Sequence, residues 1–151
     1  MRFLNKHIRC GILFLISWFP FSVSGQIDFS YHSEYYYLKG KDAASLTSSW
    51  TGADFDYSSW QKGPSPFRYG DGAGGTELQD MQGAYTSVFL RSTFECSGKD
   101  LIREMTVVAD YDDGFILWVN GNPALSVNAP ANPAYNSVAP ANHESGAGAS
   151  F

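Results

Sequence analysis

The chain has 151 residues, with fifteen Asp/Glu against ten Lys/Arg, and 44% of its residues are hydrophobic and 16% aromatic. At roughly 100–200 residues per domain, this length allows one domain. The aromatic content excludes an unfolded acidic tail, and two cysteines exclude a disulfide-stapled mini-protein. The lack of excess positive charge argues against a nucleic-acid binder. We therefore expect a single folded domain with a packed core.

Residues 1–25 have the features of a secretory signal peptide. Three basic residues precede the apolar stretch 11–23, which is too short for a membrane span of about 20 residues. Small residues before Gln26 predict cleavage after Gly25. The alternative is that the stretch is kept as a short membrane anchor. The first interpretation predicts a secreted or cell-surface protein without membrane insertion after cleavage.

Cleavage makes the remaining chain more acidic. It removes three of ten basic residues (10 − 3 = 7) and none of the fifteen acidic ones, so the formal balance becomes 7 − 15 = −8. Cys10 is removed as well, which leaves Cys96 without a partner for an intrachain disulfide. Such a surface disfavours nucleic acid and anionic membranes as partners and is compatible with neutral glycans and calcium.

Residues 26–128 are patterned like an all-β domain. Short runs rich in Tyr, Phe, Val and Thr are separated by Gly, Pro, Asn and Asp, and no helical period is sustained. We expect an edge strand around the three tyrosines at 35–37 and three further strands, at 84–95, 101–111 and 115–119.

Two dipeptides indicate how the last of these strands connect. Asp113-Gly114 and Asn120-Gly121 are sequences that tight hairpin turns require, because they tolerate positive φ. They predict an antiparallel meander through 101–111, 115–119 and the residues that follow. Two loops are expected beside it, the glycine-rich segment 62–83, and 129–151, which is rich in Ala, Pro, Asn and Gly.

A set of motifs in fixed order carries a resemblance to a known family. Together they resemble the galactose-binding-like jelly-roll domains of large secreted bacterial proteins, which accompany lamin-tail-like or spore-coat-kinase-like modules or glycoside hydrolase domains. The resemblance covers residues 50–122 and implies an antiparallel jelly-roll β-sandwich. The motifs are Trp50, Phe55-Asp56-Tyr57-Ser58-Ser59-Trp60, Pro66-Phe67-Arg68-Tyr69-Gly70-Asp71-Gly72, Asp80-Met81, Tyr85 to Arg91, Tyr111-Asp112-Asp113-Gly114-Phe115 and Val119-Asn120-Gly121.

The chain departs from that family after residue 128. Family members usually continue past a glutamate-containing loop, here Glu144, into further strands, whereas nothing after Asn128 alternates as a strand should. An open sandwich would expose strand edges and an apolar face. The expectation is an N-terminal portion of a longer protein, with 129–151 as a loop or the truncated end of the same domain.

The tryptophans are interpreted chiefly as core residues. Trp50 and Trp60 frame a turn rich in Asp and Ser, where they could also stack on the apolar face of a sugar ring. Trp118 alternates with Leu117 in an apolar strand, so we expect it to pack between layers.

Asp110, Asp112 and Asp113 form the densest acidic cluster. Calcium binds six to eight oxygens from carboxylates and carbonyls, so the cluster could supply part of a structural calcium site. The alternative is that these carboxylates cap a turn by accepting backbone hydrogen bonds. Asp112 and Asp113 are also candidate ligand-binding residues.

The glycine-rich loop supplies the other candidate ligand contacts, Tyr69 and Asp71. Binding residues concentrate on loops, although loop geometry alone also explains glycines here. The loop is not a phosphate-binding loop, because no Gly-Lys-Ser/Thr follows it.

Catalysis has little support in the sequence. The mature chain has two histidines, His32 and His143, in no metal-binding pair, and no Gly-x-Ser-x-Gly motif. We therefore expect no enzyme but a non-catalytic secreted module that binds a polysaccharide or other glycan, with no certain cofactor. The alternative is a structural or adhesive β-sandwich without a ligand.

Overall fold

The computed structural model describes residues 32–70, 72–95, 100, 105–146 and 149–150. Their regular structure is mostly strand, and it includes two short 3₁₀ turns, Gly40–Asp42 and Ser48–Thr51. The all-β prediction is therefore confirmed. The strands are β1 (Glu34–Lys39), β2 (Gln61–Pro64), β3 (Phe67–Arg68), β4 (Thr76–Glu77), β5 (Val88–Arg91), β6 (Val108–Ala109), β7 (Phe115–Val119), β8 (Asn122–Val127) and β9 (Ala149–Ser150).

The largest sheet has three antiparallel strands in the order β2-β1-β5. The predicted edge strand around the three tyrosines is β1, and it lies in the centre of the sheet, so the edge assignment was wrong. Tyr36 is paired on both sides, with Lys62 of β2 and Arg91 of β5. Both partners come from distant parts of the chain, which explains why local pattern could not show that the strand is central.

Alternation along β1 sends its side chains to two faces of the sheet. The Tyr35 and Tyr37 rings pack against Phe67 of β3, with ring centroids 6.0 and 5.2 Å apart. The Tyr36 ring meets the Tyr57 ring edge-on at 4.8 Å on the opposite face. Aromatic pairs of this geometry add stability beyond their buried area.

The hairpin of β7 and β8 confirms one predicted turn. Val119 pairs with Asn122 across Asn120-Gly121, whose φ angles are 49° and 82°. Positive φ at both central residues defines the turn that matches strand twist. The pairing shifts register between Leu117 and Trp118, which marks a β-bulge or similar irregularity.

The other predicted hairpin, at Asp112-Asp113-Gly114, is wrong. Asp113 does have positive φ (59°), but β7 pairs with β8, and β6 pairs with β9 near the end of the chain. The Asp113 N–H donates to the His143 carbonyl at 2.8 Å. The turn therefore serves the C-terminal loop, and no described meander runs from β6 to β7.

Two predicted strands are shorter than expected. Only Val88–Arg91 of 84–95 is extended in a sheet, because the chain forms a turn through Met81, whose carbonyl accepts the N–H groups of Ala84 and Tyr85. Within 101–111, β6 has two residues, and 101–104 lie outside the described residues.

The predicted loop 62–83 contains short strands instead of running free. It overlaps β2 and includes β3 and β4, which pair in parallel with Phe67 opposite Thr76. Arg68 holds the glycine-rich part in place: its Nε donates to the Gly74 carbonyl at 2.9 Å, and its Nη2 pairs with Glu77 at 3.1 Å.

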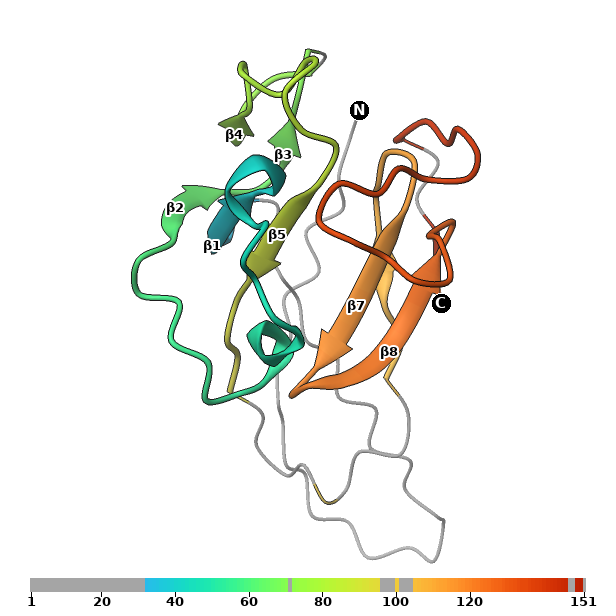
Figure 1. Cartoon of the computed structure of the whole chain (residues 1–151). Helices are drawn as coiled ribbons and strands as arrows, with labels where there is room; N and C mark the ends of the chain where they lie inside the picture. The colour runs from blue at the N-terminus through green and yellow to red at the C-terminus, as the bar shows by residue number, and fades with distance from the viewer. Residues whose placement is uncertain (1–31, 71, 96–99, 101–104, 147–148, 151) are drawn as a thin grey trace, which may run out of the picture.

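A cluster of aromatic rings connects the two largest sheets. Trp50 lies at the centre of this cluster. Its ring centroid is 5.1 Å from that of Phe89 in β5 and 5.2 Å from that of Trp118 in β7. Its ring is also 6.2 Å from that of Trp60, which is only 8% exposed. Figure 1 shows the 3₁₀ turn of Trp50 below and between the two sheets. The core assignment is confirmed for Trp60, whereas Trp50 and Trp118 pack against each other but are half-buried.

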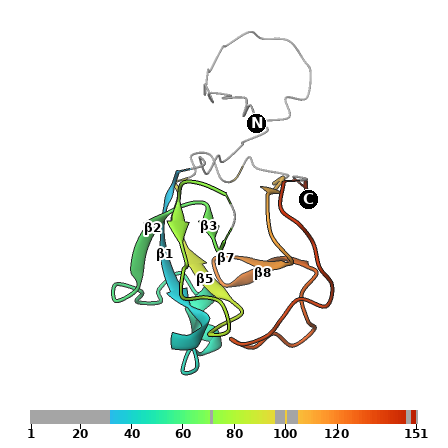
Figure 2. The same cartoon turned by 90° about the horizontal axis from the view of Figure 1, so that it is seen from above.

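The C-terminal segment is mainly irregular, as predicted, apart from β9. It returns to the residues just before β5, where Thr86 donates its hydroxyl to the Ser137 carbonyl at 2.9 Å and Ser87 donates to the Tyr135 carbonyl. In Figure 2 this segment follows the outside of the molecule beyond β8. None of the described residues forms a helix that is long and apolar enough to cross a membrane. The predicted signal peptide and Cys96 lie outside the described residues.

Candidate functional site

Sheet pairing brings three residues from distant segments into one row. Lys62 in β2 and Arg91 in β5 each lie opposite Tyr36 in β1. Directly opposed residues place their side chains on the same face of a sheet, about 4.5–5.5 Å apart at Cβ. The row therefore has a cation on each side of a tyrosine.

Arg91 connects this row to the loop that contains Trp50 and Gly52. Its guanidinium donates to the carbonyls of Trp50 and Gly52, the second at 2.9 Å, and lies 4.5 Å from the centre of the Tyr57 ring. Two hydrogen bonds and a cation–π contact from one side chain fix both the loop and the ring. Tyr57 is thereby held beside Tyr36.

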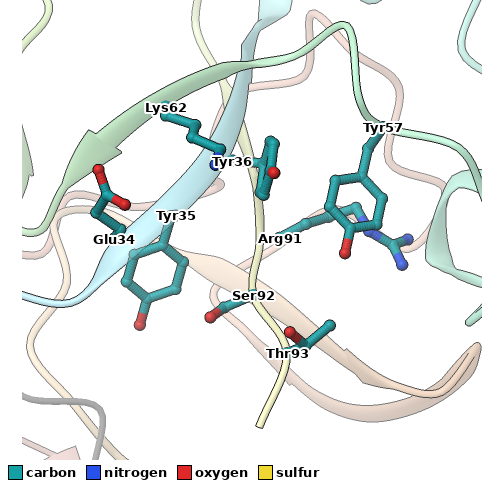
Figure 3. A pocket seen from close by; sticks show the side chains of 8 residues that line it. All are labelled: Glu34, Tyr35, Tyr36, Tyr57, Lys62, Arg91, Ser92 and Thr93. Carbon is teal, nitrogen blue, oxygen red and sulfur yellow. The ribbon is translucent and has the colours of Figure 1, made fainter.

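A small hollow opens next to this row, where β5 ends and the chain leaves the sheet (Figure 3). Its volume is about 200 Å³. That is below the roughly 300–1,000 Å³ of pockets for drug-sized ligands, so it suits one small unit of a larger molecule. Figure 3 shows the Arg91 side chain running behind the Tyr57 ring. The lining residues, here called the tyrosine pocket, are Glu34, Tyr35, Tyr36, Tyr57, Lys62, Arg91, Ser92 and Thr93.

Lys62 supplies an accessible positive charge in the tyrosine pocket. Its Nζ lies 4.5 Å from the centre of the Tyr36 ring. Hydrogen bonding to Tyr36 and, further down in size, the negative charge of Glu34 raise the pKa of Lys62, so the ammonium is protonated at neutral pH. Burial raises the pKa of Tyr35, which therefore stays a neutral hydroxyl.

The remaining polar groups of the pocket are not used by the fold. Among the described residues, the side chains of Glu34, Ser92 and Thr93 form no hydrogen bond within the protein, and all three residues are exposed. The pocket thus combines tyrosine rings, two hydroxyls and one charge of each sign that remain open to a ligand. Aromatic faces with a few hydrogen-bonding groups are the usual lining of a small-molecule site.

The acidic cluster has a different role. The Asp110 carboxylate accepts the Gly146 N–H at 2.6 Å, and that of Asp113 accepts the His143 N–H at 3.0 Å. These contacts match the turn-capping alternative. Asp112 is exposed, and its carbonyl accepts the Gly114 N–H at 3.0 Å. In the part of the chain that the structure describes, no three Asp, Glu, His or Cys side chains come together to hold a metal. The calcium site at Asp110, Asp112 and Asp113 stays a prediction.

The predicted sugar contacts on the glycine-rich loop are not brought to the pocket. Tyr69 is 42% exposed and does not line it. Asp71 lies outside the described residues. Contacts of either residue with a sugar stay a prediction.

A second, wider hollow, with a volume of about 490 Å³, is lined by Ser49 and by residues 52–56. Its acidic residues include Asp56, whose carboxylate accepts the Ser58 N–H at 2.9 Å. This bond lowers the pKa of Asp56 and assigns the carboxylate to the turn. The second hollow therefore has fewer side chains available for a ligand than the tyrosine pocket.

His143 is placed by contacts that are structural. Its ring stacks on Tyr111 at 4.1 Å with 10° between the planes, and its Nδ1–H donates to the Tyr111 carbonyl at 3.2 Å. A carbonyl can only accept, so this contact fixes Nδ1 as the protonated nitrogen.

Sequence reasoning missed the tyrosine pocket because its residues come from four separate segments of the chain, 34–36, 57, 62 and 91–93. A signal was nonetheless present: three successive tyrosines place at least one ring on each face of a strand. Finding Lys62 and Arg91 beside Tyr36 requires the register of both neighbouring strands.

Comparison with known proteins gives no match: no family model, no curated protein and no solved structure matches the chain.

Proposed function

We propose that this protein is a non-catalytic, secreted carbohydrate-binding β-domain and that the tyrosine pocket is its sugar site. One observation carries the proposal: tyrosine rings and unused hydrogen-bonding side chains line the same small hollow. Sugars have apolar faces that pack on aromatic rings and hydroxyls that need hydrogen-bond partners. Both kinds of partner are present here within one pocket.

Tyr57 is the proposed stacking ring. One of its faces is covered by the Arg91 guanidinium, and the ring lines the pocket. Its edge-on contact with Tyr36 fixes its tilt. A ring held in this way loses little conformational freedom on binding, which favours affinity.

We also infer that the two main sheets are layers of a jelly-roll sandwich like those of galactose-binding-like domains. The support is that Trp50 packs between β5 and β7, which belong to different sheets. Side chains from two facing sheets form the core of a sandwich. Secretion is proposed from the features of residues 1–25.

The test compares two tyrosine variants in a glycan-array screen followed by calorimetric titration of each glycan that binds. Tyr57→Ala should weaken binding by roughly tenfold or more, since stacking and ring burial contribute about 1–2 kcal/mol. Tyr69→Ala is the matched control, because Tyr69 is exposed and outside the pocket.

Each outcome assigns the site. An effect confined to Tyr57 supports the tyrosine pocket, and an effect confined to Tyr69 moves the site to the glycine-rich loop. Binding of no glycan would replace the proposal by the structural or adhesive alternative. Thermal unfolding of both variants shows that any loss comes from a folded protein.

A further inference from the structure

The tyrosine pocket contains a lysine that forms no ion pair within 4 Å among the described residues, although the Glu34 charge acts on it from farther away. Among the described residues, Lys39 pairs with Asp80 at 2.7 Å, Lys41 with Asp42 at 3.3 Å and Arg68 with Glu77 at 3.1 Å. No acidic side chain of the described residues lies within 4 Å of the Lys62 ammonium. Lys62 is therefore the lysine available to an acidic ligand.

The position of the Lys62 ammonium is set before any ligand binds. It lies 4.5 Å above the Tyr36 ring, a cation–π contact that restrains an otherwise flexible side chain. Figure 3 shows Lys62 and Tyr36 together at one side of the hollow, with Ser92 and Thr93 opposite. A ligand in the hollow would thus meet an ammonium and two hydroxyls.

The pocket also differs in charge from the rest of the protein. It holds two cations, Lys62 and Arg91, and one anion, Glu34, which gives a formal +2 − 1 = +1. The whole chain has a formal net charge of −5. A dense polyanion would be repelled by the chain as a whole, whereas a single acid group in the pocket would be attracted.

Only one of the two cations has free donors at its end. The Arg91 Nη atoms already donate to the Trp50 and Gly52 carbonyls, so Arg91 contributes charge more than hydrogen bonds. Lys62 is exposed and has three N–H donors, so it keeps donors for a ligand beside its hydrogen bond to Tyr36. We therefore expect Lys62, and not Arg91, to make the direct contact with an acid group.

We infer that the tyrosine pocket selects a sugar unit that bears one carboxylate, such as a uronic acid, through an ion pair with Lys62. This inference rests on the proposed function and names its ligand class. The sugar ring packs on Tyr57, and its hydroxyls bond to Ser92 and Thr93. Glu34 opposes the acid group and limits the preference to a single charge.

The experiment titrates the purified protein with two probes that differ by one charge. The probes are an aldobiouronic acid, a disaccharide of one uronate and one neutral sugar, and its methyl ester. The acid should bind up to about fivefold more tightly than the ester, the upper range for an exposed ion pair. Raising the salt to 0.5 M should reduce the preference, because salt screens exposed charges.

Three variants assign the preference to particular residues. Lys62→Met should abolish the difference between acid and ester while keeping ester binding, and Glu34→Gln should tighten acid binding. Lys41→Met is the control, since this lysine pairs with Asp42 outside the pocket and should change nothing.

The possible failures of this inference and of the proposed function are distinct. Equal binding of acid and ester, or a preference that survives Lys62→Met, overturns the inference and leaves glycan binding standing. If neither probe binds and the glycan array is also empty, the proposed function is overturned, and the inference with it.

Discussion

The tyrosine pocket and the C-terminal loop around Asp113 both gather polar side chains, but they use them differently. In the C-terminal loop, the Asp110 and Asp113 carboxylates accept backbone N–H groups, and the Asn128 amide donates to two carbonyls. In the pocket, the side chains of Glu34 and Lys62 have no such bonds to the backbone in the described residues. Polar groups satisfied by backbone stabilise a loop, whereas those left available can bind a ligand.

The same contrast explains why charge density was a poor guide to function. The acidic cluster is conspicuous in the sequence, yet a turn needs oxygen acceptors as much as a calcium ion does. The pocket has only three charged residues, which lie on three different strands. Availability of side chains, more than their number, separates the two regions.

The largest effect is expected in the aromatic cluster between the two largest sheets, outside both regions. Trp60→Ala should lower the free energy of unfolding by about 3–5 kcal/mol, because it removes a large buried ring from the cluster between the sheets. Urea denaturation measures the loss, and Trp60→Phe should recover part of it. A loss below about 1 kcal/mol would show that the core lies elsewhere.

Asn128→Ala should destabilise the C-terminal loop and leave the pocket intact. The side chain donates to the carbonyls of Asp113, at 2.8 Å, and Ala141, and the residue has a φ of 45°. Losing two hydrogen bonds and placing alanine at positive φ should cost about 2–3 kcal/mol of unfolding free energy.

Asn128→Gly is the matched variant, because glycine tolerates positive φ but makes no side-chain bonds. It should be less destabilising than Asn128→Ala in the same urea denaturation. Equal losses would contradict the backbone contribution, and a change in glycan affinity would contradict the separation of the two regions.

Arg91→Lys tests whether Arg91 holds the tyrosine pocket in shape. Lysine keeps the charge but lacks the planar fork that reaches two carbonyls, so we expect a loss of about 1–2 kcal/mol in unfolding free energy. Because Tyr57 would no longer be held, glycan affinity should fall as well. Unfolding and titration are measured on the same sample, and a fall in stability with unchanged affinity would remove Arg91 from a positioning role.

The smallest expected effect is a change in acid stability at Asp80. Its hydrogen bonds from Lys39, at 2.7 Å, and from the Tyr85 hydroxyl, at 2.9 Å, lower its pKa below the ordinary 3.8. A carboxyl with a lower pKa in the folded state stabilises the protein above pH 3.8, and this contribution disappears as the pH falls through the folded-state pKa.

Asp80→Asn should therefore flatten the fall in melting temperature between about pH 5 and pH 2, a modest change for an exposed group. Asp54→Asn is the control, since Asp54 pairs with no cation among the described residues. Identical slopes for wild type and Asp80→Asn would contradict the assignment.

Local features of the fold could be predicted well from the sequence. The all-β class followed from short β-rich runs, and the Asn120-Gly121 turn followed from steric tolerance of positive φ. The burial of Trp60 followed from the place of this large ring beside a turn. Each of these depends on residues that are neighbours in the chain.

Predictions about which segments pair with one another were less successful. The tyrosine strand was assigned to an edge and lies in the centre, and the turn at Asp113 was assigned to a hairpin and serves the C-terminal loop. Both errors concern partners far away in the sequence. Local alternation shows which residues share a face but not which strand lies beside them.

The amino-acid sequence by itself determined the all-β class and the tight turn at Asn120-Gly121, because both depend on side-chain sterics and φ preferences within a few residues. It also determined the acidic charge of the chain. Only the tertiary structure decided that Lys62, Tyr36 and Arg91 lie in one row, and that the aspartates at 110 and 113 are used by backbone. The physical reason is that strand pairing closes loops of many residues, and its register is chosen by the packing of the whole domain.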